Sequence, residues 1–247
     1  IVLTTGKFLS GLLHFGLTSF PGGRTGEAPS TLLAQALREQ LGLELGRLKT
    51  GTPPRILAKT IDFSAMTQQF ADEFEEEFSY WPREMHGKLI DAKRRNMPCF
   101  MVYSNEKTAE IVRQNLEKAP LYQGKITGIG ARYCPSFEDK VVRFAHHPRH
   151  LLYLEPEGAE TDEYYINGIS TSLPPDVQRM MIHSIDGLQN AVISRYAYAI
   201  EYDAIEPSQL KSSLELKGIS GLFFAGQING TSGYEEAASQ GLIAGIN

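Results

Sequence analysis

The sequence is short of cysteine, of long apolar runs and of excess basic charge. Two cysteines, Cys99 and Cys134, among 247 residues are too few for a disulfide framework, which favours a reducing compartment. No apolar run reaches the roughly 18 residues of a membrane span, and no signal peptide is visible. A net charge of −5 excludes nucleic-acid binding through bulk positive charge, although a local basic surface is compatible with it. These features predict a cytoplasmic protein with no membrane association.

The composition is otherwise that of an ordinary globular protein, with 42% hydrophobic and 21% charged residues. The length is enough for one large domain or two small ones. The sequence opens on IVLTTG, an apolar strand pattern without an initiator methionine, and closes on AASQGLIAGIN, inside an apolar helical pattern. We therefore expect both ends to be internal cuts in a longer chain.

Hydrophobic periodicity and turn residues predict alternating strands and helices. The predicted helices run from Ser30 to Gly42, over 104–120 and from Pro174 to Gly187, and the predicted strands cover 1–6, 98–105, 150–158, 191–205 and 221–225. Residues 47–56, RLKTGTPPRI, contain glycine and two prolines and are interpreted as a basic loop. Residues 60–95 have weak periodicity and are expected to be irregular.

The stretch GLFFAGQINGTSGYEEAASQGLIAG reads as a short buried strand, a glycine-rich turn and a helix. The free N–H groups and partial positive charge of a helix N-terminus suit an anionic or electron-rich ligand group. On spacing alone, a plain strand–helix turn is the better interpretation. Gln227 favours a ligand, because it lies at the carboxyl edge of the strand, and so does a second strand end at Thr5-Gly6. Two such strand ends are able to flank one cofactor.

These two segments resemble the C-terminal-side FAD motifs of glutathione-reductase-type flavoproteins. Taken in order, GGRTGEAPS, RLKTGTPPRI, RYCPSFEDKVVRFA, NGISTSLP and the final strand–turn–helix resemble the GidA (MnmG) family of FAD-dependent tRNA-modifying enzymes. The resemblance covers nearly the whole chain. It implies an α/β fold in which 1–57 and 195–247 form part of a glutathione-reductase-type FAD-binding domain. Residues 58–194 would form an inserted α+β domain on the substrate and NAD side.

The resemblance implies that the family's GxGxxG fingerprint precedes this sequence and that a C-terminal helical domain, which docks the GTPase partner MnmE, follows it. It also implies FAD contacts from both strand ends, from the turn and from the start of the last helix. These expected FAD contacts are Thr5, Gly6, Ser30, Gly226, Gln227, Asn229, Gly230, Gly233, Tyr234 and Glu235. By the chemistry of helix ends, the N–H groups at 233–235 are suited to stabilising a negatively charged reduced flavin.

The stretch from Gly130 to Phe144 resembles the family's NAD(H)-associated segment and carries its functional cysteine, Cys134. Cationic neighbours and a helix start lower the pKa of a thiol, and Arg132 and Lys140 supply the charge. A thiolate is able to attack C6 of uridine, although a proton-donor role and a plain packing role remain alternatives. Pro135 is expected in the first helical turn. The other expected NAD-side residues are Gly130, Ala131, Tyr133, Ser136, Asp139, Arg143 and Phe144.

Other charged or reactive residues have weaker claims to function. Cys99 lies in an apolar strand and is interpreted as a core thiol. Arg47, Lys49 and Arg55 are interpreted, with equal weight, as phosphate contacts for tRNA or a cofactor and as a solvated loop. The histidines in HHPRH lack metal-ligand spacing, so no metal site is expected.

The resemblance implies an enzyme that installs a carboxymethylaminomethyl or aminomethyl group on the wobble uridine (U34) of tRNA. Such an enzyme would use FAD, NADH and methylenetetrahydrofolate, and would act as a homodimer with tRNA and an MnmE-type GTPase. The alternatives are the related folate- and FAD-dependent tRNA uridine-54 methyltransferase, and a non-catalytic platform for tRNA or a partner in which the flavin is structural.

Overall fold

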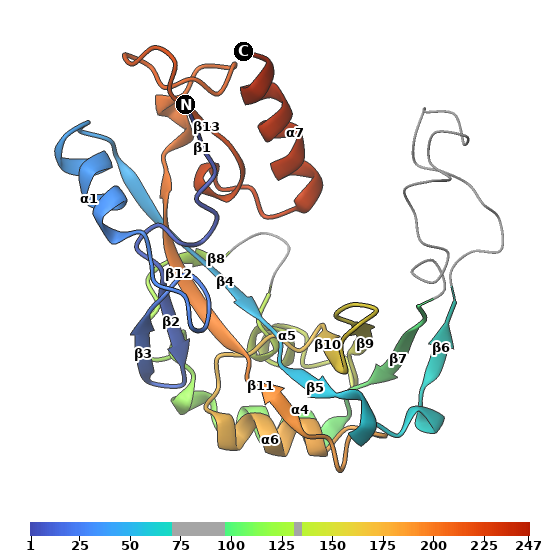
Figure 1. The fold of residues 1–247 in the computed structure, drawn as a ribbon. Helices are drawn as coiled ribbons and strands as arrows, with labels where there is room; N and C mark the ends of the chain where they lie inside the picture. The colour runs from blue at the N-terminus through green and yellow to red at the C-terminus, as the bar shows by residue number, and fades with distance from the viewer. Residues whose placement is uncertain (71–96, 131–134) are drawn as a thin grey trace, which may run out of the picture.

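The computed structural model describes residues 1–70, 97–130 and 135–247. Within these ranges the chain forms one five-stranded sheet, one six-stranded sheet and a parallel pair of strands, together with five α-helices (Figure 1). Short 3-10 helices cover Ala58–Thr60, Phe63–Ala65, Leu116–Lys118, Pro207–Gln209 and Gly226–Asn229. None of the described helices is long and apolar enough to cross a membrane.

The five-stranded sheet is organised around one fully buried strand, β12 (Tyr198–Ile205). Its strand order is β3 (Thr18–Pro21), β2 (Leu12–Phe15), β12, β4 (Leu45–Thr52) and β8 (Ile129–Gly130). All pairs are antiparallel except β4 with β8. Because β12 comes from the C-terminal part of the chain and β2 and β4 from the N-terminal part, the sheet joins segments that are far apart in sequence.

The six-stranded sheet is antiparallel throughout and carries the largest apolar core. Its order is β11 (Ile193–Arg195), β5 (Arg55–Leu57), β10 (Glu163–Asn167), β9 (Leu151–Pro156), β7 (Cys99–Tyr103) and β6 (Thr67–Gln69). The helices α4 (Glu106–Arg113), α5 (Phe137–Arg143) and α6 (Pro175–His183) contribute Val112, Phe137 and Val177 to that core.

The two ends of the chain meet in the third sheet. Strand β1 (Val2–Leu3) pairs in parallel with β13 (Phe223–Phe224), and helix α7 (Tyr234–Ile246) follows β13 after a turn (Figure 1). Helix α1 (Thr31–Glu39) shares a core cluster with Phe224 and Ile205. The predicted α/β fold is therefore confirmed, with sheets of mixed strand direction.

The predicted domain ranges remain a prediction. Most strands encoded before residue 57 and after residue 195 lie in the five-stranded sheet or in the β1–β13 pair. Strand β5, however, belongs to the six-stranded sheet, and β8 leaves the middle range to join the edge of the five-stranded sheet.

Several local predictions are confirmed and others are wrong. The helix predicted over 104–120 is present as α4, and Asn105 and Thr108 form a capping box at its start. The segment 47–56 is not a loop, because β4 continues to Thr52 and pairs along its whole length with β12, and only the two prolines interrupt it before β5. Ser30 lies at the N-cap position of α1 without a capping hydrogen bond from its side chain. Pro135 precedes the N-cap of α5 instead of lying in its first turn.

Candidate functional site

The pairing of β1 with β13 places two strand ends side by side. Leu3 lies in register with Phe224, and the Ala225 N–H donates to the Leu3 carbonyl at 3.0 Å. Beyond these residues, a Cβ added to Gly6 would lie 3.7 Å from Oε1 of Gln227. The structure therefore brings Thr5-Gly6 next to Gly226-Gln227, as the sequence predicted.

The turn after β13 is kept free of bulky side chains by glycines that the backbone requires. Gly226 and Gly230 have φ angles of +85° and +84°, in the left-handed region that favours glycine. Gly230 also lies close to β4, since a Cβ added there would be 3.8 Å from Cδ1 of Leu48. Gly230 is the exposed residue of this turn, whereas Gly226 is buried and its N–H donates to Oε1 of Gln240 at 3.0 Å.

Three buried polar atoms around these strand ends lack a hydrogen-bond partner among the described residues: Oγ1 of Thr5, Oδ1 of Asn229 and Oγ1 of Thr231. The Asn229 side chain is fixed, because its Nδ2 donates to the Phe224 carbonyl at 2.6 Å and to Oε1 of Gln240 at 2.9 Å. A buried polar atom without a partner costs about 1–3 kcal/mol. Three such atoms at one edge fit a polar ligand that supplies the missing partners.

The start of α7 is partly occupied by its own acid. Oε2 of Glu236 accepts from the N–H of Gly233 at 3.0 Å and from that of Ser232 at 3.3 Å. The Gly233 N–H, which was predicted to bind a ligand, therefore donates to Glu236 in this structure. The N–H groups of Tyr234 and Glu235 lie in the first turn, where helices offer no internal acceptor. Residues 232–236 line an open hollow, and Tyr234 is 92% exposed beside it.

The described NAD-side residues of the prediction lie on β8, on α5 or directly beside α5. Gly130 ends β8 and lies in register with Lys49 of β4. Ser136 caps α5, since its Oγ accepts from the Asp139 N–H at 3.2 Å, and Asp139 forms a 3.7 Å ion pair with the exposed Arg143. Phe144 follows the helix and is also exposed. The predicted residues Ala131, Arg132, Tyr133 and Cys134 lie outside the described residues.

Lys140 holds α5 against the connection between β10 and α6. Its Nζ donates to the Gly168 carbonyl at 2.8 Å. Its predicted role as a cationic neighbour of Cys134 stays a prediction.

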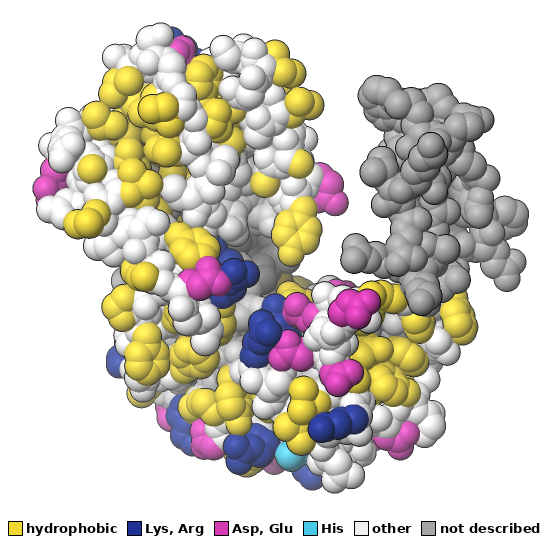
Figure 2. Space-filling view, in the orientation of Figure 1, with side chains coloured by type: hydrophobic (Ala, Val, Ile, Leu, Met, Phe, Trp, Pro, Cys, Tyr) yellow, Lys and Arg dark blue, Asp and Glu magenta, His cyan; other side chains and the backbone are white. Residues whose placement is uncertain are grey.

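Strand β4 contacts both the turn after β13 and the predicted NAD-side segment. Leu48 approaches the glycine turn after β13, and its neighbour Lys49 pairs with Gly130 of the predicted NAD-side segment. Adjacent residues of β4 thus contact the turn after β13 and the predicted NAD-side segment. Figure 2 shows Lys, Arg and acidic side chains gathered beside the recess between the part that holds α7 and the part that holds the six-stranded sheet.

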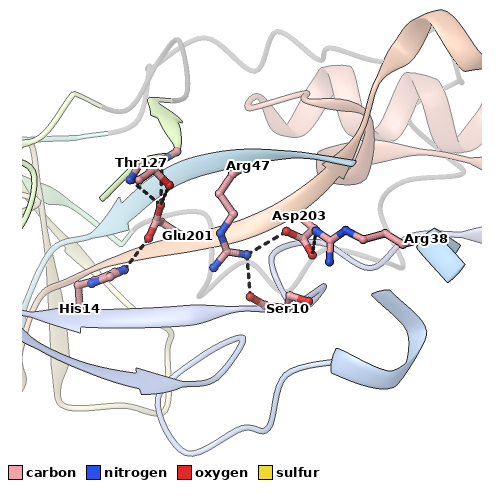
Figure 3. A network of polar contacts seen from close by, with 8 residues as sticks. Ser10, His14, Arg38, Arg47, Thr127, Glu201 and Asp203 are labelled. Atoms are coloured by element: carbon pink, nitrogen blue, oxygen red, sulfur yellow. Dashed lines mark hydrogen bonds and ion pairs between the residues drawn. The ribbon is translucent and has the colours of Figure 1, made fainter. Parts of the chain in front are cut away.

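A buried polar network on β12 was missed by the sequence analysis (Figure 3). Oε2 of Glu201 lies 2.9 Å from Nε2 of His14, and Oε1 accepts from the backbone N–H groups of Thr127 at 2.9 Å and Gly128 at 2.8 Å. Two residues along the strand, Asp203 pairs with Arg47 at 3.1 Å and with Arg38 at 2.8 Å. The alternation in YAIEYDAI was the available signal, since residues 201 and 203 share one face of a buried strand.

The Glu201 carboxylate stays ionised over the whole physiological range. Burial alone would raise its pKa, but the hydrogen bonds from His14, Gly128 and Thr127 outweigh burial and lower the pKa to about 2. Glu201 thereby fixes the chain that enters β8, directly before the predicted NAD-side residues.

Glu138 is a second buried carboxylate that the sequence analysis missed. Its Oε1 accepts from the N–H and the Oγ of Ser172, both at 2.9 Å, while its Oε2 has no hydrogen-bond partner among the described residues. The Ser172 carbonyl in turn accepts from the Gly16 N–H at 2.6 Å. Glu138 therefore links α5 to the turn between β2 and β3.

Cys99 is half-buried on β7. Burial raises the pKa of its thiol, and the nearby Glu155 raises it further. A raised pKa keeps the sulfur protonated, which is typical of an unreactive structural thiol.

Substituting Gly128 with alanine is expected to destabilise the protein by about 1–3 kcal/mol, because the new Cβ would lie only 2.8 Å from the carbonyl carbon of Leu48. Gly130→Ala is the matched control, since a Cβ there meets nothing within 4 Å. Thermal unfolding of the two variants measures the difference. Equal melting temperatures would contradict the close approach of Gly128 to β4.

Comparisons with known proteins agree with this arrangement over the whole chain. The family model for glucose inhibited division protein A matches residues 1–247. The tRNA uridine 5-carboxymethylaminomethyl modification enzymes MnmG of Thermodesulfovibrio yellowstonii and Geobacter sulfurreducens are 56% and 55% identical over 247 residues, which is 100% of this chain and 38% of each relative.

Two crystal forms of Aquifex aeolicus GidA are structurally similar to the chain. Form I has a TM-score of 0.89 at 49% identity and form II a TM-score of 0.87 at 47%, with 100% of this chain covered and 41% and 39% of theirs. The chain thus spans about two-fifths of the length of the relatives it matches. A match of this extent shows that the chain belongs to the glucose inhibited division protein A (GidA, MnmG) family.

Proposed function

We propose that this chain is part of an FAD- and NADH-dependent enzyme that modifies the wobble uridine of tRNA. The observation that carries the proposal is the meeting of Thr5-Gly6 with Gln227 at the β1–β13 edge, where three buried polar atoms lack partners among the described residues. The names of the matched MnmG relatives support the reaction class, a modification of tRNA uridine.

The residues at this edge fit FAD. The orphaned atoms of Thr5, Asn229 and Thr231 would exchange hydrogen bonds with polar groups of the flavin and its ribityl chain. Gly226 and Gly230 would let the cofactor approach the backbone, and the N–H groups of Tyr234 and Glu235 would face negative charge on it. When bound, FAD supplies the electron transfer that the modification requires.

The substrate and the reductant would approach from the side of β8 and α5. Gly130, Ser136 and Asp139 are proposed to contact NADH, and Cys134 to act on the uridine ring as nucleophile or proton donor. Arg132 and Lys140 are proposed to hold the thiol in its reactive form. Methylenetetrahydrofolate as one-carbon donor, an MnmE-type GTPase partner, a homodimer and a cytoplasmic location belong to the same proposal, and all rest on the family resemblance.

The test uses the full-length protein. Purified protein is expected to carry the visible absorption band of oxidised flavin, and anaerobic NADH is expected to bleach it. Nucleoside analysis of tRNA from a strain that lacks the endogenous enzyme is then expected to regain the modified wobble uridine when the full-length gene is supplied. A flavin that NADH does not reduce, together with normal tRNA binding, would instead favour a non-catalytic platform. Methylation of uridine-54 would favour the related methyltransferase.

A further inference from the structure

An exposed patch of aromatic rings and cations follows helix α5. From Lys140 to Leu154 the sequence carries one lysine, two arginines and three histidines and no acidic residue, although the whole chain has a net charge of −5. The histidines belong to no cluster of potential metal ligands among the described residues. The loop after α5 and the end of β7 present the exposed side chains of this surface, which we call the ring patch: Tyr103, Phe144, His146, His147 and Arg149.

The rings of the patch are held in place from the core outwards. Phe137, which is fully buried in the largest core, contacts the His150 ring edge-on at a centroid distance of 5.7 Å. His150 in turn contacts His147 at 6.4 Å. The exposed His147 contacts two more rings, His146 at 4.3 Å and Phe144 at 6.2 Å. Rings that are already positioned in this way lose little conformational freedom when a flat ligand binds to them.

The backbone of the loop is fixed at both ends. The His147 N–H donates to the Phe144 carbonyl at 2.9 Å. At the other end, the Ser104 N–H donates to the His150 carbonyl and the His150 N–H donates to Oγ of Ser104, both at 2.9 Å. The ring patch is therefore preorganised by backbone hydrogen bonds as well as by ring contacts.

Arg149 presents a flat cation on the same surface. Its guanidinium group lies over the Tyr103 ring, 4.2 Å from the centroid, and Tyr103 is itself 43% exposed. Within the described ranges no acid forms an ion pair with Arg149. Arg143 forms only a 3.7 Å pair with Asp139 and stays exposed. A guanidinium group stacked on a ring keeps the N–H donors in its plane available for a phosphate group or a base edge.

The histidines contribute rings rather than charge. Burial, together with the nearby Lys140 and His147, lowers the pKa of His150, so this ring is neutral at physiological pH. The positive charge of the patch therefore comes from Arg143 and Arg149. Two cations beside exposed flat rings fit a single-stranded nucleic acid, because its phosphates pair with arginine and its unpaired bases stack on rings. An acidic peptide would use the cations and leave the rings without a role.

We propose that the ring patch binds unpaired nucleotides of a tRNA, with His147 stacking on a base and Arg149 holding a phosphate group; this rests on the proposed function, which makes tRNA the substrate. Helix α5 has seven residues, so the patch lies about 10 Å along the helix axis from Ser136 at its start. Cys134 precedes Ser136 by two residues in the sequence. A tRNA whose target uridine reaches Cys134 would bring its neighbouring nucleotides within reach of the patch.

The test measures the dissociation constant of tRNA for variants of the full-length enzyme over a range of salt concentrations. His147→Ala is expected to raise the dissociation constant about 5- to 50-fold, whereas His147→Phe, which keeps a ring, is expected to stay within about 2-fold of wild type. Arg149→Gln is expected to weaken binding and to lower the slope of log affinity against log salt by about 0.7, the loss of one phosphate contact on a single strand. FAD content and the KM for NADH are expected to stay unchanged in all three variants.

Two control variants are matched to these in exposure. Arg113→Gln removes an exposed arginine of α4 that donates to Glu106 at 2.8 Å, and Phe20→Ala removes a 52% exposed ring on β3. Neither control is expected to change the dissociation constant of tRNA. Melting temperatures are measured for every variant, and Arg149→Gln keeps the test decisive if His147→Ala unfolds, because the Arg149 side chain is exposed.

The outcomes are distinct. A wild-type enzyme that does not bind tRNA removes the proposed function and this inference with it. A wild-type enzyme that binds tRNA, with variants that keep its affinity and salt dependence, overturns the inference alone. An equal loss of affinity in His147→Phe and His147→Ala would contradict stacking, and a loss of binding to a protein partner at unchanged tRNA affinity would assign the patch to that partner, so either result also overturns the inference.

Discussion

Replacing Glu201 with alanine is expected to lower the free energy of unfolding by about 3–5 kcal/mol. The substitution leaves the buried His14 ring and the buried Gly128 N–H without an acceptor, and it opens a cavity beside β12. Asp203→Ala is the informative comparison, because it removes a carboxylate from the same face of the same strand. Its partners are the side chains of Arg38 and Arg47, which are 45% and 27% exposed and are able to turn to water.

We therefore expect Glu201→Ala to destabilise the protein clearly more than Asp203→Ala. Denaturant unfolding of both variants measures this order. A larger loss of stability for Asp203→Ala would contradict this order. It would mean that the ion pairs of Asp203 stabilise the sheet more than the hydrogen bonds from Glu201 to β2 and to the chain before β8.

The Glu201 contribution is also expected to depend on pH. Its pKa is lowered from 4.5 to about 2 in the folded protein, so its stabilisation is fully present above pH 4.5 and is lost as the pH falls toward 2. The stability difference between wild type and Glu201→Gln is thus expected to shrink by about 3 kcal/mol over that interval. Unfolding curves at several acidic pH values measure it, and a constant difference would contradict the ionised, hydrogen-bonded carboxylate.

Cys134→Ser in the full-length enzyme is expected to reduce tRNA modification by on the order of 10³-fold or more, because a hydroxyl group at that position has almost none of the nucleophilicity of a thiolate. FAD content and reduction by NADH are expected to be retained, since those steps do not use the sulfur. Cys99→Ser is the matched control. The pKa of Cys99 is raised, and it lies on β7, in the six-stranded sheet, away from the β1–β13 edge.

Nucleoside analysis of tRNA treated with each variant distinguishes the two cysteines. Full tRNA modification by Cys134→Ser would mean that Cys134 has only a packing role. Loss of modification in Cys99→Ser, with full modification by Cys134→Ser, would mean that Cys99 is the reactive cysteine.

Local signals predicted those parts of the fold that depend on short stretches of chain. The helix that starts after Asn105 and the strand, turn and helix around Gly226 are set by neighbouring residues, and they lie within the ranges predicted for them. Strand β4 was misread because its glycine and following prolines suggest a loop, whereas pairing with β12 satisfies its backbone along the whole strand. Long-range pairing of this kind is not encoded in the segment itself.

The candidate site divides in the same way. The meeting of Gly6 and Gln227 followed from two strand ends that each carry a ligand-type turn, and the structure brings them together. The partners of Glu201 depend on which strands become neighbours, so no local pattern was able to predict them. Arg47 and Lys49 of β4 and Arg55 of β5 looked equivalent in sequence, whereas the fold pairs Arg47 with Asp203 and Arg55 with Glu157.

The central claim is that the β1–β13 edge holds FAD through buried polar atoms that have no partner among the described residues. The measurement is the FAD dissociation constant of full-length protein carrying Thr5→Val and Thr231→Val, compared with Thr18→Val on the exposed strand β3. Our account predicts that the double variant binds FAD at least about 10-fold more weakly, with an unchanged or higher melting temperature of the FAD-free protein, because two orphaned hydroxyls are removed. Wild-type FAD affinity in the double variant would contradict it.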